Sequence, residues 1–320
     1  MPVARIALGR PVKRLLTILL LGISALCAAR AQDDPDWKLC QANDADDNAI
    51  AACTRLIDAN RLLGQGDRVI ACYKRGAAYW RKHDYDRAIA DENTAIEIDP
   101  NYANAYMRRG TSFAGKGDYE RAIADESKAT EIDPKNVKAY TNRGGFRGQQ
   151  GDHASAIADA TEAIELDPKF ATAYSIRGEN YARSGDDERA IADASKAIEI
   201  EPKFRNPYRL RASVYMKNGD NDRAIADYTM LIEIDPQNAY TYGFRGDAYL
   251  RQGDNDRAIA DFAKQIELYS DDPRAYLDRS DAYAAKHDNV AALADNNKAI
   301  ELIKRHAETR ERSQFETRQR

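Results

Sequence analysis

The sequence predicts an all-α solenoid of antiparallel helix pairs, and three regularities of the chain indicate it. An Arg-Gly dipeptide, or a close variant, recurs every 34 residues. Within each copy, aromatic and small residues recur at helical spacing. An Asp stands near the centre of every copy, where one helix would end and the next begin. Repeats of this length bury their apolar faces by stacking on their neighbours, so we expect a row of helix pairs without one central core.

The period is set by seven dipeptides that fall 34 residues apart without a slip: Arg75-Gly76, Arg109-Gly110, Arg143-Gly144, Arg177-Gly178, Arg211-Ala212, Arg245-Gly246 and Arg279-Ser280. The copies therefore span residues 69–102, 103–136, 137–170, 171–204, 205–238, 239–272 and 273–306. Together they cover about three quarters of the chain.

The second copy shows how one unit is expected to fold. Tyr106, Gly110 and Phe113 share one face of a first helix, and Gly110 allows the second helix to approach closely. Gly117-Asp118 predicts the turn between the helices. Glycine tolerates the left-handed backbone that ends a helix, and aspartate accepts hydrogen bonds from the free N–H groups of the next helix.

These positions resemble the signature of the tetratricopeptide repeat family. A Tyr opens the first helix, a second aromatic residue follows, a small Ala marks the second helix and a Pro closes it, as at Tyr106, Phe113, Ala122 and Pro134. The resemblance extends over residues 69–306. It implies a right-handed superhelical solenoid whose concave surface, lined by the first helix of each copy, binds a protein or peptide.

The resemblance also implies which side chains would face that groove, namely the second, fifth and ninth of each copy. These positions differ from copy to copy, whereas the core positions repeat. Such variation is expected of a surface that recognises an irregular partner. It is equally expected of a surface whose residues are under no structural constraint. The candidates are Tyr73, Asn104, Met107, Thr111, Lys138, Thr141, Ser175, Glu179, Asn206, Arg209, Ser213, Tyr240, Asp247 and Asp281.

One charged pattern recurs in all seven copies, with an Arg before the Gly of the first helix and an Asp on the second helix. We interpret it as a structural salt bridge between paired helices, because antiparallel packing brings the two positions together and the planar Arg fork binds a carboxylate bidentately. The alternative is a ladder of cations lining a groove for an acidic ligand. The pairs are Arg75/Asp91, Arg109/Asp125, Arg143/Asp159, Arg177/Asp193, Arg211/Asp227, Arg245/Asp261 and Arg279/Asp295.

Residues 35–68 resemble a divergent helix pair that would cap the array. Cys40 and Cys53 occupy the aromatic positions where its two helices face each other, so we expect a disulfide between them. Such a bond would close a loop of about 14 residues and contribute about 3 kcal/mol. Cys72 would then be a buried free thiol, with a Cys53–Cys72 bridge as the alternative.

The later copies depart from the pattern in two places. In the third copy Arg147 stands where the core aromatic belongs, and we expect a soft or shifted helix there, able to serve as a hinge. In the last copy the closing Pro is missing, so the final helix can continue past Ile300. Residues 307–320 would form a charged extension of that helix, or a tail.

Residues 1–31 have the pattern of a secretory signal peptide. Basic residues come first, an apolar run of about a dozen residues follows, and Ala29-Arg30-Ala31 offers small residues to a signal peptidase. An uncleaved membrane anchor is the alternative. Cleavage would remove five cations and no anions, which takes the net charge from −4 to −9. We expect an exported protein, periplasmic or secreted, in which a disulfide can form.

No pattern in the sequence points to catalysis, a cofactor or a metal. The four histidines, His83, His153, His287 and His306, fall on separate loops and on the tail. There is neither a phosphate-binding glycine loop nor a Gly-x-Ser-x-Gly motif. The acidic balance argues against nucleic-acid binding. We therefore expect a non-catalytic scaffold that binds a protein or peptide. The alternatives are a self-assembling envelope component and an accessory subunit of an enzyme or transport complex.

Overall fold

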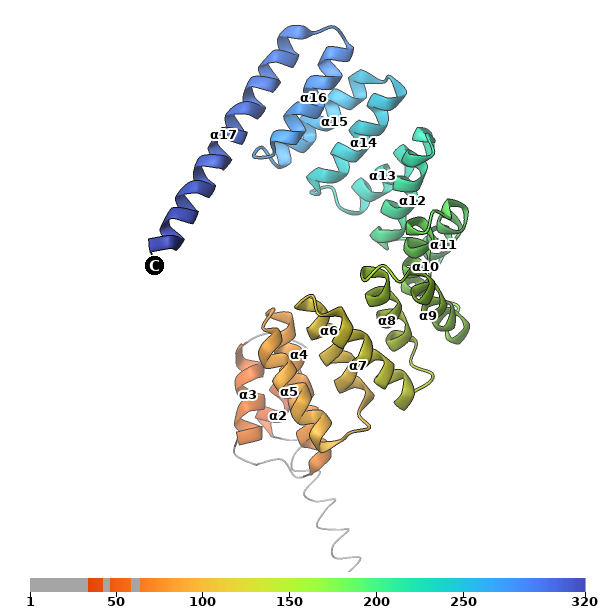
Figure 1. Ribbon diagram of the computed structural model, residues 1–320, viewed down its shortest axis with the longest axis vertical. Coiled ribbons are helices and arrows are strands. Elements are labelled where there is room, and N and C mark those ends of the chain that lie inside the picture. Colours follow the sequence, from red (N-terminus) through yellow and green to blue (C-terminus); the bar gives the residue numbers. More distant parts are fainter. Residues whose placement is uncertain (1–33, 43–46, 59–63, 320) are drawn as a thin grey trace, which may run out of the picture. The chain divides into compact units, whose positions relative to one another are not determined.

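The computed structural model describes residues 34–42, 47–58 and 64–319, and the signal peptide expected at residues 1–31 lies outside them. The described residues form helices and turns, with no strand among them (Figure 1). The helices are α2 (Pro35–Gln41), α3 (Asp47–Asp58), α4 (Gln65–Arg81), α5 (Tyr85–Ile98), α6 (Ala103–Gly115), α7 (Tyr119–Ile132), α8 (Val137–Gln149), α9 (His153–Leu166), α10 (Ala171–Arg183), α11 (Asp187–Ile200), α12 (Arg205–Lys217), α13 (Asn221–Ile234), α14 (Ala239–Gln252), α15 (Asn255–Leu268), α16 (Pro273–Ala285) and α17 (Asn289–Gln319).

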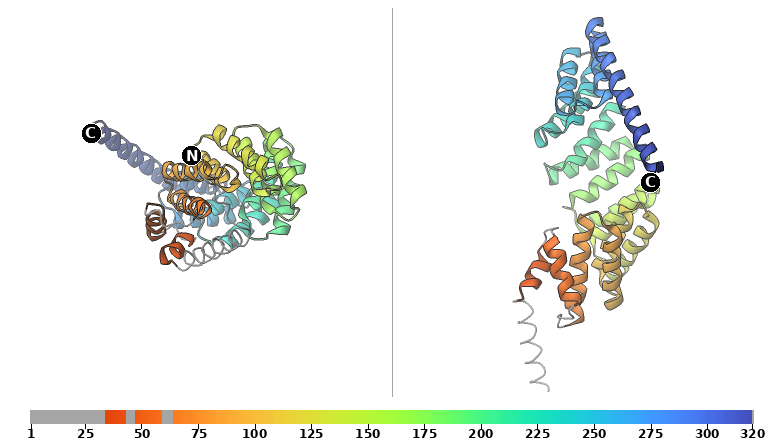
Figure 2. Two further views of the ribbon diagram at one scale, coloured as in Figure 1. Left: turned by 90° about the horizontal axis from the view of Figure 1, so that it is seen from below. Right: turned by 90° about the vertical axis from the view of Figure 1, so that its left-hand side faces the viewer.

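The chain divides into two compact units, of which the first ends at Leu166 and the second begins at Asp167. Helices α2 to α9 belong to the first unit and α10 to α17 to the second. Within each unit, every helix packs against the one before it and the one after it, so that pairs follow one another in a row (Figure 2). This is the all-α solenoid that the 34-residue period predicts.

The turn between the two helices of a pair is built from the residues that the sequence singles out. The carboxylate of Asp118 accepts a hydrogen bond from the backbone N–H of Arg121 at 3.1 Å and so caps α7. Gly117 has a φ of 81°, in the left-handed region that favours glycine. His83 and His287 hold the same position in two other turns, with φ values of 60° and 63°.

Close packing between paired helices depends on small residues. A Cβ atom added to Gly110 would lie 3.1 Å from the carbonyl oxygen of Ala122 and 3.3 Å from the Cβ of Asp125. Ala122 itself is completely buried, and Phe113 of α6 is buried as well. The small residues therefore set how closely α6 and α7 approach.

The N-terminal pair has the expected covalent link. Cys40 of α2 and Cys53 of α3 form a disulfide, and Trp37 and Leu56 pack in the cluster around it. Cys72 is a buried free thiol, so the alternative Cys53–Cys72 bridge is not formed. Burial raises the pKa of the Cys72 thiol to about 11, which keeps it protonated.

Two helix boundaries differ from simple repetition, whereas α8 keeps the usual bounds. Helix α4 begins at Gln65, upstream of the copy boundary expected at residue 69. Helix α17 has 31 residues and continues well past Ile300, as the missing Pro predicts. Helix α8 is continuous through Arg147, whose Nη1 donates to the carboxylate of Asp159 at 2.8 Å. The hinge at this copy stays a prediction.

Candidate protein-binding site

The seven Arg/Asp pairs are ion pairs in the structure, and they join the two helices of each pair. In Arg109, Nε and Nη2 donate to the two oxygens of Asp125 at 2.8 and 2.7 Å, and Nη1 donates to Asn93 of the preceding copy at 2.7 Å. The aspartates are buried. Each of these arginines is therefore already paired with a buried aspartate of its own copy. The alternative, a ladder of free cations, is not what the structure shows. The remaining pairs are Arg75–Asp91, Arg143–Asp159, Arg177–Asp193, Arg211–Asp227, Arg245–Asp261 and Arg279–Asp295.

The candidate groove residues of the first unit lie on α4, α6 and α8. Five of them are exposed or partly exposed: Tyr73, Asn104, Met107, Thr111 and Lys138. Thr141 differs from the prediction because it is buried, and its hydroxyl donates to the carbonyl of Val137 at 2.8 Å within α8. A helical threonine can satisfy its hydroxyl on the preceding turn, so this position offers a partner no free polar group.

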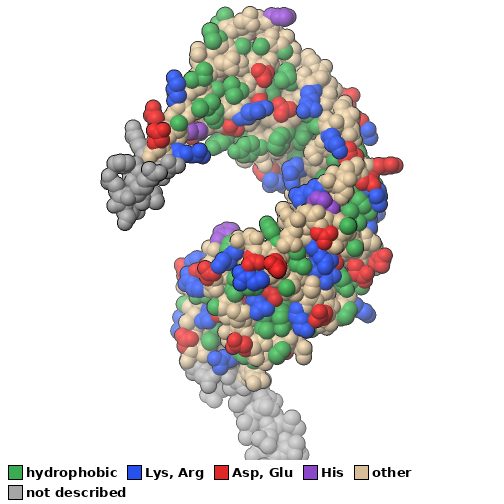
Figure 3. Space-filling view, in the orientation of Figure 1, with side chains coloured by type: hydrophobic (Ala, Val, Ile, Leu, Met, Phe, Trp, Pro, Cys, Tyr) green, Lys and Arg blue, Asp and Glu red, His purple; other side chains and the backbone are tan. Residues whose placement is uncertain are grey.

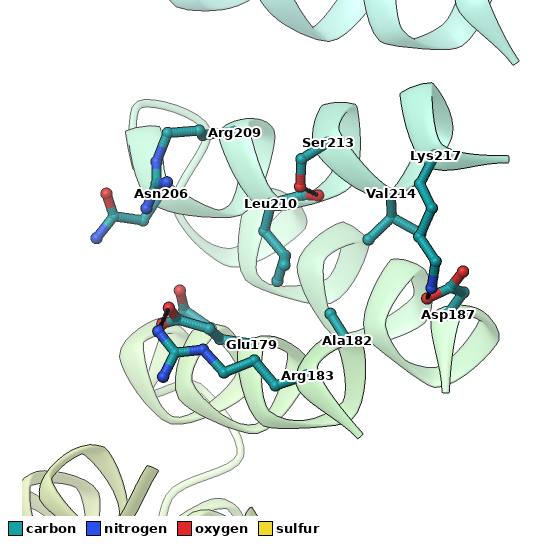
Figure 4. Close-up of a pocket in the computed structure, with 11 residues that line it drawn as sticks. Glu179, Ala182, Arg183, Asp187, Asn206, Arg209, Leu210, Ser213, Val214 and Lys217 are labelled. Carbon is teal, nitrogen blue, oxygen red and sulfur yellow. Dashed lines mark hydrogen bonds and ion pairs between the residues drawn. The ribbon is translucent and has the colours of Figure 1, made fainter. Parts of the chain in front are cut away.

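In the second unit, five candidates meet at one pocket of about 290 Å³ between α10 and α12. Ser175 and Glu179 come from α10, and Asn206, Arg209 and Ser213 come from α12. Ser175 is largely buried at the pocket wall. Figure 4 shows the α12 side chains facing those of α10 across the gap. Leu210 and Val214 supply apolar lining, so the pocket combines apolar contact with polar groups.

Within the described part of the chain, one cation at this pocket has no ion-pair partner. Glu179 pairs with Arg183 at 2.8 Å, and Lys217 pairs with Asp187 at 2.8 Å. Arg209 is exposed, and it forms no hydrogen bond or ion pair with any described residue. A guanidinium in this state can bind a carboxylate of a ligand through two parallel hydrogen bonds.

A second surface of this unit lies on α14 and α16, and we call it the aromatic–acidic patch: Tyr240, Phe244 and Asp247 of α14 with Leu277 and Asp281 of α16. Tyr240 and Phe244 keep 54% and 45% of their surface exposed. Figure 3 shows hydrophobic and acidic side chains close together over these helices. Burial, followed by the nearby charge of Asp278, raises the pKa of Asp247 to about 6.

Sequence reasoning found only part of this patch. Tyr240, Asp247 and Asp281 are candidates at the expected groove positions. Leu277 lies at the fifth position of the last copy, also a groove position, but was not among the candidates, and Phe244 lies at the sixth position of its copy. Phe244 stacks on Tyr228 with ring centroids 5.9 Å apart, which fixes its position while leaving one side open. The sixth position of other copies holds residues such as Arg108 and Leu210, so repetition gave no signal for an exposed aromatic there.

Two buried glutamates of the first unit were also missed. Glu92 is completely buried, and neither of its carboxyl oxygens has a hydrogen-bond partner in the described part of the chain. Glu126 accepts a hydrogen bond from Nδ2 of Asn142 at 3.0 Å, and burial raises its pKa to about 9. The equivalent residues of the next two copies are Ala160 and Ala194. Glu126 is therefore neutral in the folded chain at neutral pH, and burial also raises the pKa of Glu92 well above its ordinary value.

The described residues contain no cluster of His, Cys, Asp or Glu suited to a metal ion. Within the same residues, no helix is long and apolar enough to cross a membrane.

Comparisons with known proteins agree with the repeat architecture. Models of the tetratricopeptide repeat match residues 73–137, 147–203 and 245–306, which is more than half of the chain, and a further model matches residues 208–238. No curated protein sequence matches.

Several solved structures are similar in fold. A tetratricopeptide repeat protein from Parabacteroides merdae is 22% identical, with a TM-score of 0.55, over 74% of this chain and 94% of that one. PilF of Pseudomonas aeruginosa is 20% identical, with a TM-score of 0.59, over 69% of this chain and 99% of that one. At these identities the likeness concerns the fold alone. The repeat period, the ion-paired helix pairs and the matching family models together establish that this chain belongs to the tetratricopeptide repeat family and is built as a protein-interaction scaffold.

Proposed function

We propose that the chain is a non-catalytic scaffold that holds an extended segment of a partner protein against the first helices of its second unit. The observation that carries the proposal is the pocket between α10 and α12. It is formed by residues that vary between copies, and it exposes Arg209, which has no ion-pair partner among the described residues. Affinity would come from many modest contacts along the surface rather than from one deep site.

The two surfaces of this unit favour different parts of a partner. Arg209 and the amide of Asn206 suit an acidic side chain or a backbone carbonyl. The aromatic–acidic patch suits a basic residue flanked by apolar ones, because Tyr240 and Phe244 offer apolar area beside the carboxylates of Asp247 and Asp281. A segment that carries an acidic residue and a basic–apolar residue would satisfy both surfaces.

We further propose that the protein is exported to the periplasm or the cell exterior. The basic–apolar–small pattern of residues 1–31 supports this location. The Cys40–Cys53 disulfide supports it as well, because such bonds persist in oxidising compartments.

The test is selection from a library of random displayed peptides, followed by titration of the selected peptides by calorimetry. We expect peptides that contain an acidic residue, and we expect Arg209→Glu to weaken their binding about tenfold or more, because a favourable charge contact becomes a repulsive one.

Lys203→Glu is the matched control. It makes the same change of charge at an exposed loop residue outside the pocket, so binding should stay within about twofold of the unmodified chain. Selected peptides whose affinity is equal for the chain and both variants would show that the pocket is not the binding site.

A further inference from the structure

The last helix, α17, leaves four large aliphatic side chains uncovered on one face. Helix α16 packs against α17 and buries Ala299 and Leu302. The uncovered side chains fall within an arc of about 140° around the helix at 100° per residue. We call them the terminal stripe, which has an inner pair, Leu293 and Ile300, exposed by 61% and 49%, and an outer pair, Val290 and Ile303, exposed by 83% and 50%.

Interior copies show what covers the inner pair's positions elsewhere in this unit. Ile191 and Ile198 of α11 are the equivalents of Leu293 and Ile300 three copies earlier. Both are partly buried, and they pack against the cluster that contains Tyr208 of α12, the first helix of the next copy. No described helix follows α17. The inner pair is therefore one half of a repeat-to-repeat interface whose other half is not among the described residues.

The spacing of the terminal stripe is symmetric along the helix. Leu293 lies as far before the midpoint between Asn296 and Asn297 as Ile300 lies after it, and the outer pair is placed in the same way. On a helix with 100° per residue, Leu293 and Ile300 also point about 10° to either side of the direction that the midpoint faces. A surface with this arrangement is complementary to itself under a two-fold rotation, which is the requirement of an isologous contact.

We propose that a second copy of this chain docks on the terminal stripe, with the two α17 helices antiparallel about a two-fold axis at Asn296 and Asn297. In this register Leu293 packs against Ile300 of the second copy. In the same way, Val290 of the outer pair packs against Ile303 of the second copy. At the centre, Asn297 faces Asn296 of the second copy. An amide side chain carries both donors and acceptors, so these two residues can hydrogen-bond to each other across the axis.

The charges near the stripe are compatible with the same register. Lys304 falls opposite Asn289 of the second copy, and Glu301 falls opposite Ala292. No two like charges oppose each other, so the contact carries no electrostatic penalty that would favour another pairing. Four aliphatic side chains per copy make a contact smaller than the roughly 800 Å² per partner of a standard interface. We therefore expect a reversible dimer with a Kd in the micromolar range or weaker.

The first test is sedimentation equilibrium of the full chain over a range of concentrations. We expect a monomer–dimer equilibrium that Leu293→Asp abolishes. Met230→Asp, which replaces an exposed apolar residue on α13, is the matched control and should leave the dimer intact. Far-UV circular dichroism should be unchanged in both variants, because each replaced side chain is exposed. A chain that stays monomeric up to about 1 mM, or that forms open-ended oligomers, overturns the proposal.

The second test addresses the register. In Asn297→Cys the new thiols of two copies would lie next to the two-fold axis, so mild oxidation should yield a disulfide-linked dimer. Lys298→Cys places the thiol on the far side of α17 and should yield little cross-link. The buried Cys72 thiol should not compete, and the unmodified chain measures the background. Equal cross-linking of both variants would contradict the antiparallel arrangement. Arg209→Glu should leave the dimer unchanged, so the dimer and the peptide pocket are tested independently.

Discussion

Arg211 binds both carboxylate oxygens of Asp227, at 2.9 Å from Nε and 2.7 Å from Nη2. Its remaining nitrogen, Nη1, donates to the hydroxyl of Ser195 in the preceding copy at 2.7 Å. One side chain thus links the two helices of its own copy and also fastens that copy to the one before it. Only the planar guanidinium fork can make all three contacts.

Replacing the guanidinium of Arg211 should lower the free energy of unfolding, by an amount that depends on whether the new side chain keeps the charge. We expect Arg211→Lys to lower the free energy of unfolding by about 1–2 kcal/mol, because Lys keeps the charge and loses the bidentate geometry. Arg211→Met should cost about 3 kcal/mol, since it leaves the buried Asp227 carboxylate unpaired. Urea unfolding measures both. The control, Arg205→Met, breaks an exposed pair with Asp235 and should cost less than about 0.5 kcal/mol. Equal losses at residues 205 and 211 would contradict the structural role of the fork.

The buried carboxyl of Glu126 should make stability fall as pH rises. Its pKa is raised from an ordinary value of 4.5 to about 9, so the folded chain holds a proton that the unfolded chain releases between these values. Stability is then highest below pH 4.5 and decreases by about 1.4 kcal/mol per pH unit up to pH 9 from this group. Glu126→Gln should remove that decrease and be the more stable form at pH 8. Urea midpoints at pH 5 and pH 8 provide the measurement, with the exposed Glu131→Gln as control.

Backbone geometry predicts opposite effects at two turns. Gly185 has a φ of 85°, and Gly185→Ala should destabilise the chain by about 1 kcal/mol because a Cβ strains this conformation. His287 has a φ of 63° in the equivalent turn, and His287→Gly should stabilise it by about 0.5–1 kcal/mol. Thermal unfolding of the two variants checks the signs. A destabilised His287→Gly would indicate that the histidine makes a favourable contact that outweighs the strain.

Reduction of Cys40–Cys53 should loosen the N-terminal helix pair. The bond closes a short loop, with a sequence separation of 13, and its loss should cost about 3 kcal/mol of local stability. Hydrogen exchange should then show α2 and α3 losing protection before α4.

Cys72 should resist alkylation until the first unit unfolds, because its thiol is buried and its pKa is raised to about 11. Rapid labelling of Cys72 in the native chain would show that the first unit opens readily around α4.

Binding at the aromatic–acidic patch should depend on pH, and this prediction rests on the proposed function. The pKa of Asp247 is raised to about 6, so the carboxylate is charged above this pH and neutral below it. Affinity for a lysine-containing apolar peptide should fall as the pH is lowered from 7.5 to 5. Asp247→Asn should bind weakly at both values. The control, Glu233→Gln, likewise neutralises a carboxylate, at an exposed position on α13, and should behave as the unmodified chain. Calorimetric titration at the two pH values distinguishes them.

Much of the fold could be predicted because one residue pattern recurs in seven copies. The Gly-Asp turn, the small residues at helix contacts and the Arg/Asp pairs each repeat at a fixed position, so each copy supports the interpretation of the others. Cys40 and Cys53 could be paired because they occupy helix positions that face each other in the other copies. These inferences concern local geometry, which a repeat specifies directly.

The site was harder to predict because it depends on what does not repeat. Thr141 satisfies its hydroxyl within its own helix, whereas Arg209 at the equivalent position two copies later is exposed. Glu92 stands where the third and fourth copies have Ala160 and Ala194, and its residue type gave no sign of complete burial. Exposure at such positions is decided by the size of neighbouring side chains, which the period leaves free to vary.

The disulfide at one end of the array gives unfolding a direction. A row of copies in which each contacts its neighbours tends to lose structure from its ends, since an end copy has only one neighbour to hold it. The bond between Cys40 and Cys53 secures α2 to α3, while no such bond secures α17 to α16 among the described residues. Opening should therefore start at α17 in the oxidised chain. After reduction of the disulfide, α2 and α3 should open readily as well.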